Sequence, residues 1–237
     1  MIFLRYLIVA AFFSYFARHS AFLLKRKIIN REVKKVQVIR EIVYSWISSF
    51  IFGAFATWIL YSFKRGQTHL YLHIHWYDFF WIPCSLFLIL FMHETYYYWI
   101  HRWMHKPGVY KWIHRTHHES LVTTAWTSFS FHPLESLLQA LPLFLIIYFL
   151  PLQIVTVILA LIIMALTSVV NHLNSELYPE STYRSRLGSW WIGATHHSLH
   201  HSRFNYNYGL YFTFWDRWMK TEAGDFASVF TEVTHTK

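Results

Sequence analysis

Cysteine and charged residues are the scarce components of this 237-residue chain. Its single cysteine, Cys84, lies in an apolar run, which excludes an internal disulfide and a sulfur-ligated metal site. Charged residues make up 14% of the chain, against about a quarter in a typical soluble domain, and apolar and aromatic residues make up 55%. We find no internal repeat, low-complexity tract or second soluble domain. The sequence therefore predicts one sizeable membrane-embedded domain.

The net charge of +9 raises the question of nucleic-acid binding. The basic residues, however, flank apolar runs and do not form a stripe on a soluble helix, a pattern typical of membrane topology. Seven lysines and arginines lie between residues 25 and 40. The positive-inside rule places this basic loop in the cytoplasm. We therefore expect no nucleic-acid partner.

Long apolar runs predict the membrane-spanning helices. The first two are 22 residues long, enough to cross a hydrocarbon core of about 30 Å. The third has no charge over 35 residues, and Pro151 divides it into a helical hairpin. The predicted helices are residues 42–63, 79–100, 134–150 and 152–170.

Both ends of the chain differ from its middle. Residues 2–17 are apolar apart from Arg5 and a few polar side chains, and no clear signal-peptide cleavage site follows them. They predict either a span or a half-buried helix. We divide the chain into an N-terminal apolar segment with the basic loop (1–40), a membrane catalytic domain (41–222) and a tail (223–237). The predicted fold class is all-α: a multi-pass bundle of about four transmembrane helices, with residues 2–17 as a candidate fifth, and a histidine-rich cap.

The histidines form two clusters that this topology brings to one face. Residues 93–118 contain six histidines and residues 196–201 contain four. If the basic loop is cytoplasmic, the spans return both clusters to the cytoplasm, whether or not residues 2–17 cross. We expect a bacterial inner membrane or an endoplasmic reticulum membrane. The histidines between residues 69 and 75 fall on the far side, where an interfacial position is favoured over metal binding.

Helical spacing gives each cluster a narrow fan of imidazoles. Positions four apart lie about 40° apart on a helix, so His101 and His105 project together, as do His114 and His118. His117 lies about 60° to the other side of His114. A lone histidine is by default a satisfied core or interface residue. Eight imidazoles in repeated spacings favour a metal instead, and they exceed the about five or six that one ion takes, so two ions are implied.

Other polar residues near the clusters are candidates for supporting roles. Glu94 shares the helix face of the first ligand pair, and either it or the more distant His93 could orient a ligand or only satisfy its neighbours. Glu176 would share a face with His172 if that segment is helical. His196 points about 100° away from its neighbouring ligand and is the weaker candidate. His132 is either a supporting residue or a helix cap.

These motifs resemble those of the fatty acid hydroxylase and sterol desaturase superfamily of integral-membrane di-iron enzymes. The matching segments are EtyyYWiHR (94–102), HRTHH (114–118), FHPLE (131–135), NHLNSE (171–176), HHSLHH (196–201) and NYGLYFTFWDRW (207–218). The resemblance covers about residues 35–222. It implies eight catalytic metal ligands, His101, His105, His114, His117, His118, His197, His200 and His201, with His172 as a ninth. The superfamily often has aspartate where Glu94 stands, which leaves an acidic role open there.

The resemblance also implies an activity. The chain would be an oxidoreductase, an O2-dependent non-haem di-iron enzyme that hydroxylates or desaturates a membrane lipid in sterol or fatty-acyl metabolism. Its cofactors would be two Fe ions, with O2 as co-substrate. The chain holds no segment suited to the fused haem domain of some relatives, so we expect a separate electron donor, a small haem or ferredoxin-type carrier with its reductase. The particular lipid, the choice between hydroxylation and desaturation, and the oligomeric state stay open.

The competing interpretation is a non-enzymatic membrane metal-binding protein or metal transporter. A transporter would place ionisable or metal-binding groups within the spans, along a path. The predicted hairpin has no charge and no histidine before His172. A zinc-dependent hydrolase usually needs three protein ligands, far fewer than are present. The sequence therefore favours an enzyme.

Overall fold

A computed structural model describes residues 2–235 of the chain, and this part is helical, with isolated β-bridges and no strand. Its helices are α1 (Ile2–His19), α2 (Ala21–Lys25), α3 (Lys35–Lys64), α4 (Asp78–Met104), α5 (Pro107–Ile113), α6 (Arg115–His118), η1 (Ala125–Phe129), α7 (Pro133–Phe149), α8 (Ile154–Asn171), α9 (Glu180–Arg184), η2 (Gly188–Trp190), α10 (Ala194–Arg203), α11 (Phe214–Trp218) and α12 (Phe226–Thr234). By length and composition, α1, α3, α4 and α8 are able to cross a membrane, and α7 is a shorter apolar helix. The predicted all-α membrane bundle is confirmed.

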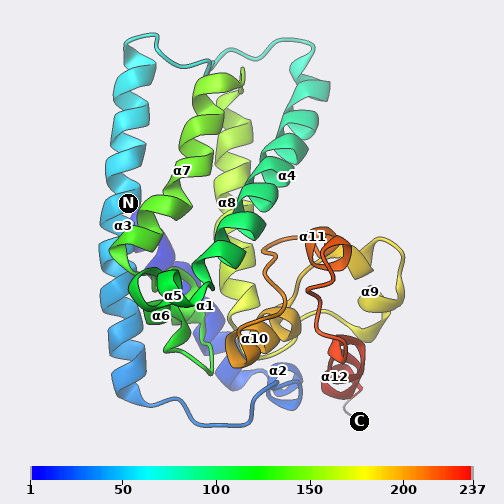
Figure 1. The fold of residues 1–237 in the computed structure, drawn as a ribbon. Coiled ribbons are helices and arrows are strands. Elements are labelled where there is room, and N and C mark those ends of the chain that lie inside the picture. Colours follow the sequence, from blue (N-terminus) through cyan, green and yellow to red (C-terminus); the bar gives the residue numbers. More distant parts are fainter. Residues whose placement is uncertain (1, 236–237) are drawn as a thin grey trace.

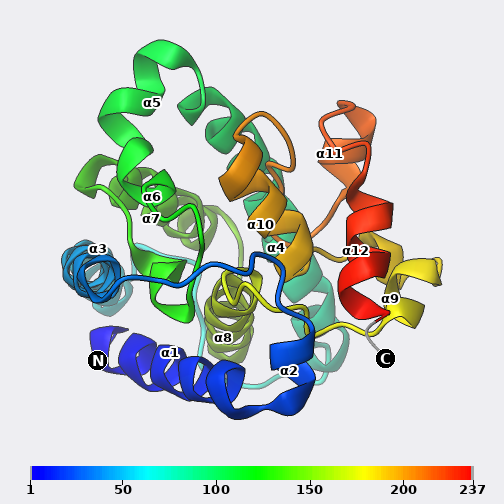
Figure 2. The same ribbon diagram turned by 90° about the horizontal axis from the view of Figure 1, so that it is seen from below.

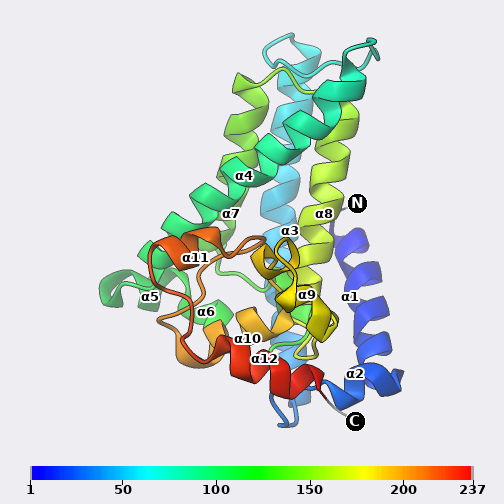
Figure 3. The same ribbon diagram turned by 90° about the vertical axis from the view of Figure 1, so that its right-hand side faces the viewer.

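The helices α3, α4, α7 and α8 form the shaft of the molecule (Figure 1). At one end of the shaft lie the connections between α3 and α4 and between α7 and α8. The short helices α5, α6 and α10 lie at the other end, and α6 and α10 carry histidines of the two clusters (Figures 1 and 3). The basic loop between α2 and α3 lies at this same end. The helix α1 packs against α3 and α8.

The hairpin forms where the apolar run and Pro151 predict it. The helix α7 begins with His132 as its cap and Pro133 in its first turn, where a proline loses no hydrogen bond. Pro151 falls between α7 and α8. The sequence alone therefore defines this part of the shaft to within a few residues.

The helix α3 is longer than its uncharged run indicated. It begins at Lys35, seven residues before the predicted start at residue 42. The extra turns carry Glu41, whose buried carboxylate accepts hydrogen bonds from Gln37 at 2.8 Å and from Ser120 at 2.7 Å. Thr124 and Thr127, next to and within η1, also donate to it. A charge ends an apolar run, but here it does not end the helix, because the carboxylate is satisfied inside the cap.

The segment after α4 differs from its prediction. The proline and glycine of Lys106–Gly108 predict a turn, and the histidine spacing after it predicts one helix that presents His114, His117 and His118. Pro107 instead opens α5, as a proline readily does in a first helical turn. The helix then stops at Ile113, and α6 starts at Arg115 with His114 between them.

The last helix supports the cap from the side. Figure 2 shows α10 lying between α6 and α12. Phe226 and Phe230 of α12 pack with Leu199 of α10 in one buried cluster. Part of the predicted tail, residues 226–234, is therefore a helix that holds the histidine-bearing α10 in place.

Candidate metal centre

Nine histidines converge at the cap in two adjacent groups, and each group's potential ligand atoms lie within 4.8 Å of one another. The first group is His101, His105, His114, His118 and His200, and the second is His117, His172, His197 and His201. All are buried except His105, which is partly buried. The structure therefore brings together all nine histidines that were expected to be metal ligands.

Each three-histidine motif contributes to both groups. In HRTHH, His114 and His118 join the first group and His117 joins the second. In HHSLHH the division is reversed, with His200 in the first group and His197 and His201 in the second. This follows from helical geometry, since positions four apart share a face and the position between them points elsewhere. The two motifs thereby tie the two groups to the same pair of short helices.

Five of the imidazole rings are oriented through their Nδ1 atoms. The acceptors are Tyr208 O for His101 (2.8 Å), Glu135 Oε1 for His114 (2.8 Å), Ser130 O for His117 (3.2 Å), Ser168 O for His172 (2.6 Å) and Tyr206 O for His200 (2.7 Å). Backbone carbonyls only accept hydrogen bonds, so the four rings that face them donate from Nδ1, and His114 does so when Glu135 is the acceptor. In the neutral ring the Nε2 lone pair is then free to bind a metal.

These free lone pairs face one another across short distances. The Nε2 atoms of His101 and His114 are 3.0 Å apart. Those of His117 and His172 are 3.3 Å apart. His117 and His172 both donate from Nδ1 to backbone carbonyls, so no hydrogen bond joins their Nε2 atoms, and the two lone pairs repel unless a cation lies between them. The same holds for His101 and His114 when Glu135 accepts from His114. All-imidazole donors suit iron, zinc, copper or nickel, so these residues fit a metal ion in each group.

The protonation states also suit metal binding. Burial lowers the pKa of six cap histidines well below the usual value of 6.5, and neighbouring groups, mainly other imidazoles, lower it further: His114, His117, His118, His197, His200 and His201. Burial lowers the pKa of His172 to about 4. The rings are therefore neutral near pH 7, which is the form that binds metals.

Glu135 is the site residue that sequence reasoning missed. It belongs to the FHPLE motif, and its Oε1 lies 2.8 Å from Nδ1 of His114, with both side chains fully buried. It is also the last charged residue before the 35-residue uncharged run. An acid retained at the edge of a membrane-embedded hairpin is a signal of function that could have identified it.

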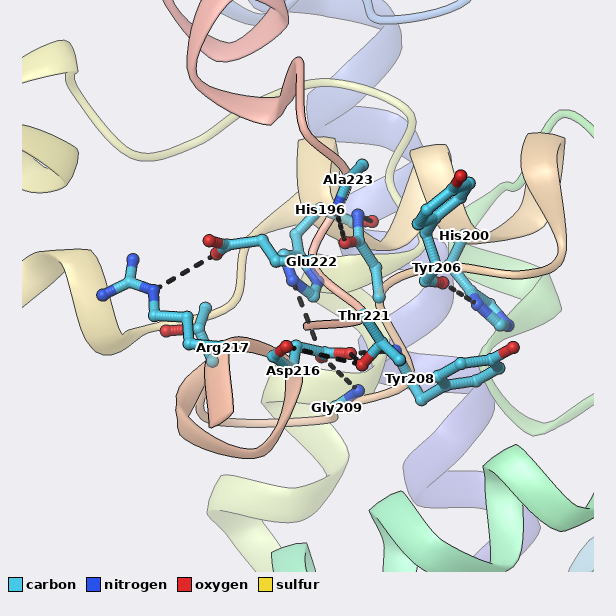
Figure 4. A network of polar contacts seen from close by, with 12 residues as sticks. His196, His200, Tyr206, Tyr208, Gly209, Asp216, Arg217, Thr221, Glu222 and Ala223 are labelled. Atoms are coloured by element: carbon cyan, nitrogen blue, oxygen red, sulfur yellow. Dashed lines mark hydrogen bonds and ion pairs between the residues drawn. The ribbon is translucent and has the colours of Figure 1, made fainter. Parts of the chain in front are cut away.

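The loop between α10 and α11 supplies two of the orienting carbonyls. Asp216 holds this loop by accepting from Tyr208 N at 2.9 Å, Gly209 N at 2.8 Å and Thr221 Oγ1 at 2.7 Å (Figure 4). Burial raises the pKa of Asp216 to about 6. The loop in turn places Tyr206 O against Nδ1 of His200. Asp216 was part of a matching motif but was not singled out from the sequence.

Glu94 acts on the same loop. Its carboxylate accepts from Leu210 N at 3.1 Å and from Tyr211 N at 2.7 Å. Its hydrogen bonds therefore go to the loop amides, while His101 is oriented by the carbonyl of Tyr208. Glu94 and His101 share a helix face as predicted, but they do not contact each other in a hydrogen bond. Each of them bonds to the backbone of the loop instead.

Glu176 supports α10, whereas support of His172 was expected. Its two oxygens accept from Tyr178 N at 3.0 Å and Thr195 N at 2.8 Å. The helix α8 ends at Asn171, so the helical spacing that would align Glu176 with His172 does not apply. A carboxylate at the first turn of α10 stabilises the helix that carries HHSLHH.

The remaining candidates lie outside both groups. The ring of His196 packs 5.4 Å from that of Phe226, and its Nε2 is 3.8 Å from Oδ2 of Asp216. His132 caps α7, accepting from Leu134 N at 3.3 Å, so the capping alternative holds for it. His93 lies within the shaft helix α4, about two turns before His101, and its Nδ1 is 3.2 Å from the hydroxyl of Tyr211.

An apolar cavity of about 390 Å³ lies between the shaft helices and reaches His172 of the second histidine group. Its walls include Phe52 of α3, Leu143 of α7 and Leu161 of α8. His172 of the second group lines it as well, together with His93. This volume is in the range of about 300–1,000 Å³ that is usual for pockets of small-molecule ligands. The cavity therefore gives an apolar ligand access to the second histidine group from the membrane-embedded part of the protein.

Gly209 leaves no room for a side chain in the orienting loop. A Cβ there would lie 2.7 Å from both Ile192 Cδ1 and the backbone oxygen of Phe212. We expect Gly209→Ala to destabilise the protein by about 1–3 kcal/mol, as overpacking does, and to weaken metal retention. Thermal melting and metal content of the purified protein measure this. Gly224→Ala is the matched control, since its Cβ meets nothing within 4 Å; equal behaviour of the two variants would contradict the prediction.

Membrane-length helices and a nine-histidine cap define a multi-pass membrane protein with a histidine-rich centre. Residues 86–221 match the fatty acid hydroxylase family, and the chain belongs to that family. It is 38% identical over 142 residues to a Delta(7)-sterol 5(6)-desaturase of Gibberella zeae, covering 60% of this chain and 37% of that protein. It is 33% identical over 190 residues to lathosterol oxidase of Homo sapiens, covering 77% and 60%. The chain thus spans less than two thirds of these relatives. No solved structure matches it significantly.

Proposed function

We propose that this protein is a membrane-bound di-iron oxygenase that hydroxylates or desaturates a lipid C–H bond with O2 and electrons from a separate redox partner. The observation that carries the proposal is the pairing of nine converging imidazoles with an apolar cavity that ends at one of them, His172. Membership of the fatty acid hydroxylase family supports the reaction class. The names of the relatives, which include sterol desaturases and lathosterol oxidase, support a sterol or related lipid as substrate.

The nine histidines would hold two iron ions, one in the group of five and one in the group of four. When bound, these ions would supply the activation of dioxygen and the oxidation of the C–H bond. The chain's own residues prepare the site. Burial keeps the imidazoles neutral, and the Nδ1 acceptors orient five of the nine rings so that their Nε2 atoms face the two groups. The buried cap also excludes bulk water from the reacting atoms.

The apolar walls of the cavity would hold the lipid beside the second group. Because the cavity lies between shaft helices, a lipid can enter it without leaving the apolar phase. The basic loop lies at the same end of the bundle as the histidines, which supports a cytoplasmic position of the site. A separate electron donor, a small haem or ferredoxin-type carrier with its reductase, would then reach it from the cytoplasm.

Isotope labelling tests the proposal. The chain is placed in membranes with an electron-donor pair, deuterated sterols and fatty acids are added, and ¹⁸O2 is supplied. Mass spectrometry of the extracted lipids is expected to show either one ¹⁸O per product, for hydroxylation, or loss of two deuterons, for desaturation. Membranes kept under nitrogen are the control. No O2-dependent change in any lipid class, together with metal flux across sealed vesicles, would replace the proposal with a metal transporter.

A further inference from the structure

Arg5 is the one lysine or arginine among the described residues that line the largely apolar cavity. Arg5 of α1 contributes to its wall beside Ile2, Phe52 and Phe129. No aspartate or glutamate is among the described residues that line the cavity. Arg5 also lies outside residues 86–221, the part of the chain that matches the family. Neither family membership nor the metal centre therefore assigns it a role.

The guanidinium of Arg5 is incompletely satisfied by the protein. Its buried Nε has no hydrogen-bond partner among the described residues. Glu41, the buried acid of the neighbouring helix α3, is already engaged by Gln37 and by three hydroxyl donors. A buried donor without a partner is costly, more so when it is charged, and ionisable residues within membrane-embedded helices usually mark a ligand path.

The segment around Arg5 packs against the segment around His172. The adjacent Tyr6 stacks on Phe129 with ring centroids 5.4 Å apart, and its hydroxyl donates to Trp126 O at 2.8 Å. Tyr6 also belongs to the same buried cluster as Val169, three residues before His172, and Leu173, the residue after it. Arg5 and His172 therefore line one cavity, and residues beside them in the chain pack in the same cluster.

A second incompletely satisfied donor lines this cavity from α7. Gln139 is part of the wall, and apart from an interaction with Glu135 of the same helix, its buried Nε2 has no hydrogen-bond partner among the residues that the structure describes. Two donors, one of them cationic, thus border an apolar space that contains no acid. A pure hydrocarbon would leave both unsatisfied. A lipid with an oxygen at one end would satisfy them while its apolar body fills the remaining volume.

We propose that Arg5, assisted by Gln139, binds the terminal oxygen of the lipid ligand, the hydroxyl of a sterol or the carboxylate of a fatty acid. Binding of that oxygen near His172 selects the lipids that the cavity accepts. It also places a carbon that is near this oxygen in the lipid next to the histidine groups. The ligand assignment stands on the cavity alone, and only its consequence for oxidation rests on the proposed function.

Equilibrium binding of paired lipids tests this assignment. The full chain in nanodiscs is titrated, without O2 or electron donor, with radiolabelled cholestanol and cholestane and with palmitate and hexadecane. The wild type is expected to prefer the oxygen-bearing member of at least one pair by about tenfold or more, as a hydrogen bond to a charged group provides. Arg5→Leu is expected to remove that preference. The pair that responds identifies the sterol hydroxyl or the fatty-acid carboxylate as the ligand group.

Arg18→Leu is the matched control, because Arg18 is an exposed arginine in the last turn of the same helix. It should bind all four lipids as the wild type does. If Arg5→Leu does not fold, Arg5→Lys and Gln139→Leu should each weaken the preference severalfold. A wild type without preference in either pair, or an undiminished preference in the Arg5 and Gln139 variants, would overturn the assignment. Oxidation is not measured here, so a failure of the proposed enzymatic function would leave the result intact.

Discussion

Alanine at His117 is expected to abolish lipid oxidation and to reduce the iron content of the protein from two ions to about one per chain. His117 is one of only four histidines in the second group, and its Nε2 lies 3.3 Å from that of His172. Loss of a residue that merely orients a metal ligand costs about 10–100-fold, so loss of a ligand should exceed this. Elemental analysis of the purified protein and the labelled-lipid assay provide the two measurements.

The companion variant His200→Ala affects the other group. His200 Nε2 lies 3.0 Å from that of His118 and 3.2 Å from that of His105, so its loss opens the group of five. We expect activity to disappear here too, with iron lost from the first group. His73→Ala is the control, since His73 is exposed in the loop at the opposite end of the bundle. Two ions and full activity in either cap variant would show that the ligand assignment is mistaken.

The shaft and the set of histidines could be predicted because their signals are local. An apolar run long enough to cross a bilayer predicts a helix whatever it packs against. Likewise, the spacing of His114, His117 and His118 fixes their relative directions on any helical segment, and these directions survived the break between α5 and α6. The first cluster follows two shaft helices and the second follows four, and an even number of antiparallel helices returns the chain to the same end.

The support of the cap could not be predicted in the same way. Four of the five Nδ1 acceptors are backbone carbonyls, and every residue type carries one. Two of these four carbonyls, those of Tyr206 and Tyr208, lie in the irregular loop after α10, whose backbone amides donate to Glu94 and Asp216. Glu176 shows the same limit, because its role changed once α8 ended at Asn171. Helical spacing loses its meaning where the helix stops.

Glu135→Gln should lower metal retention by about 10–100-fold while leaving the fold in place. The buried carboxyl group lies 2.8 Å from Nδ1 of His114, and as the acceptor of that proton it would leave Nε2 of this ring available to a metal. The amide has nearly the same shape but no charge, and it can present an NH2 group to the ring in place of an acceptor. Iron remaining after dialysis against a chelator, measured with the melting temperature, separates loss of metal from loss of fold.

The matched control is Glu119→Gln, a partly exposed acid one residue after His118 that pairs with Arg40 at 3.0 Å. Both variants remove one negative charge from the cap, but only Glu135 touches a ring of the metal groups. If electrostatics of the whole cap governed metal binding, both variants would lose iron alike. If Glu135 acts through the orientation of His114, only its variant should lose iron, and Glu135→Asp, which keeps the charge but shortens the reach, should lose an intermediate amount. Equal retention in all three variants would mean that the His114–Glu135 contact does not help to hold the metal.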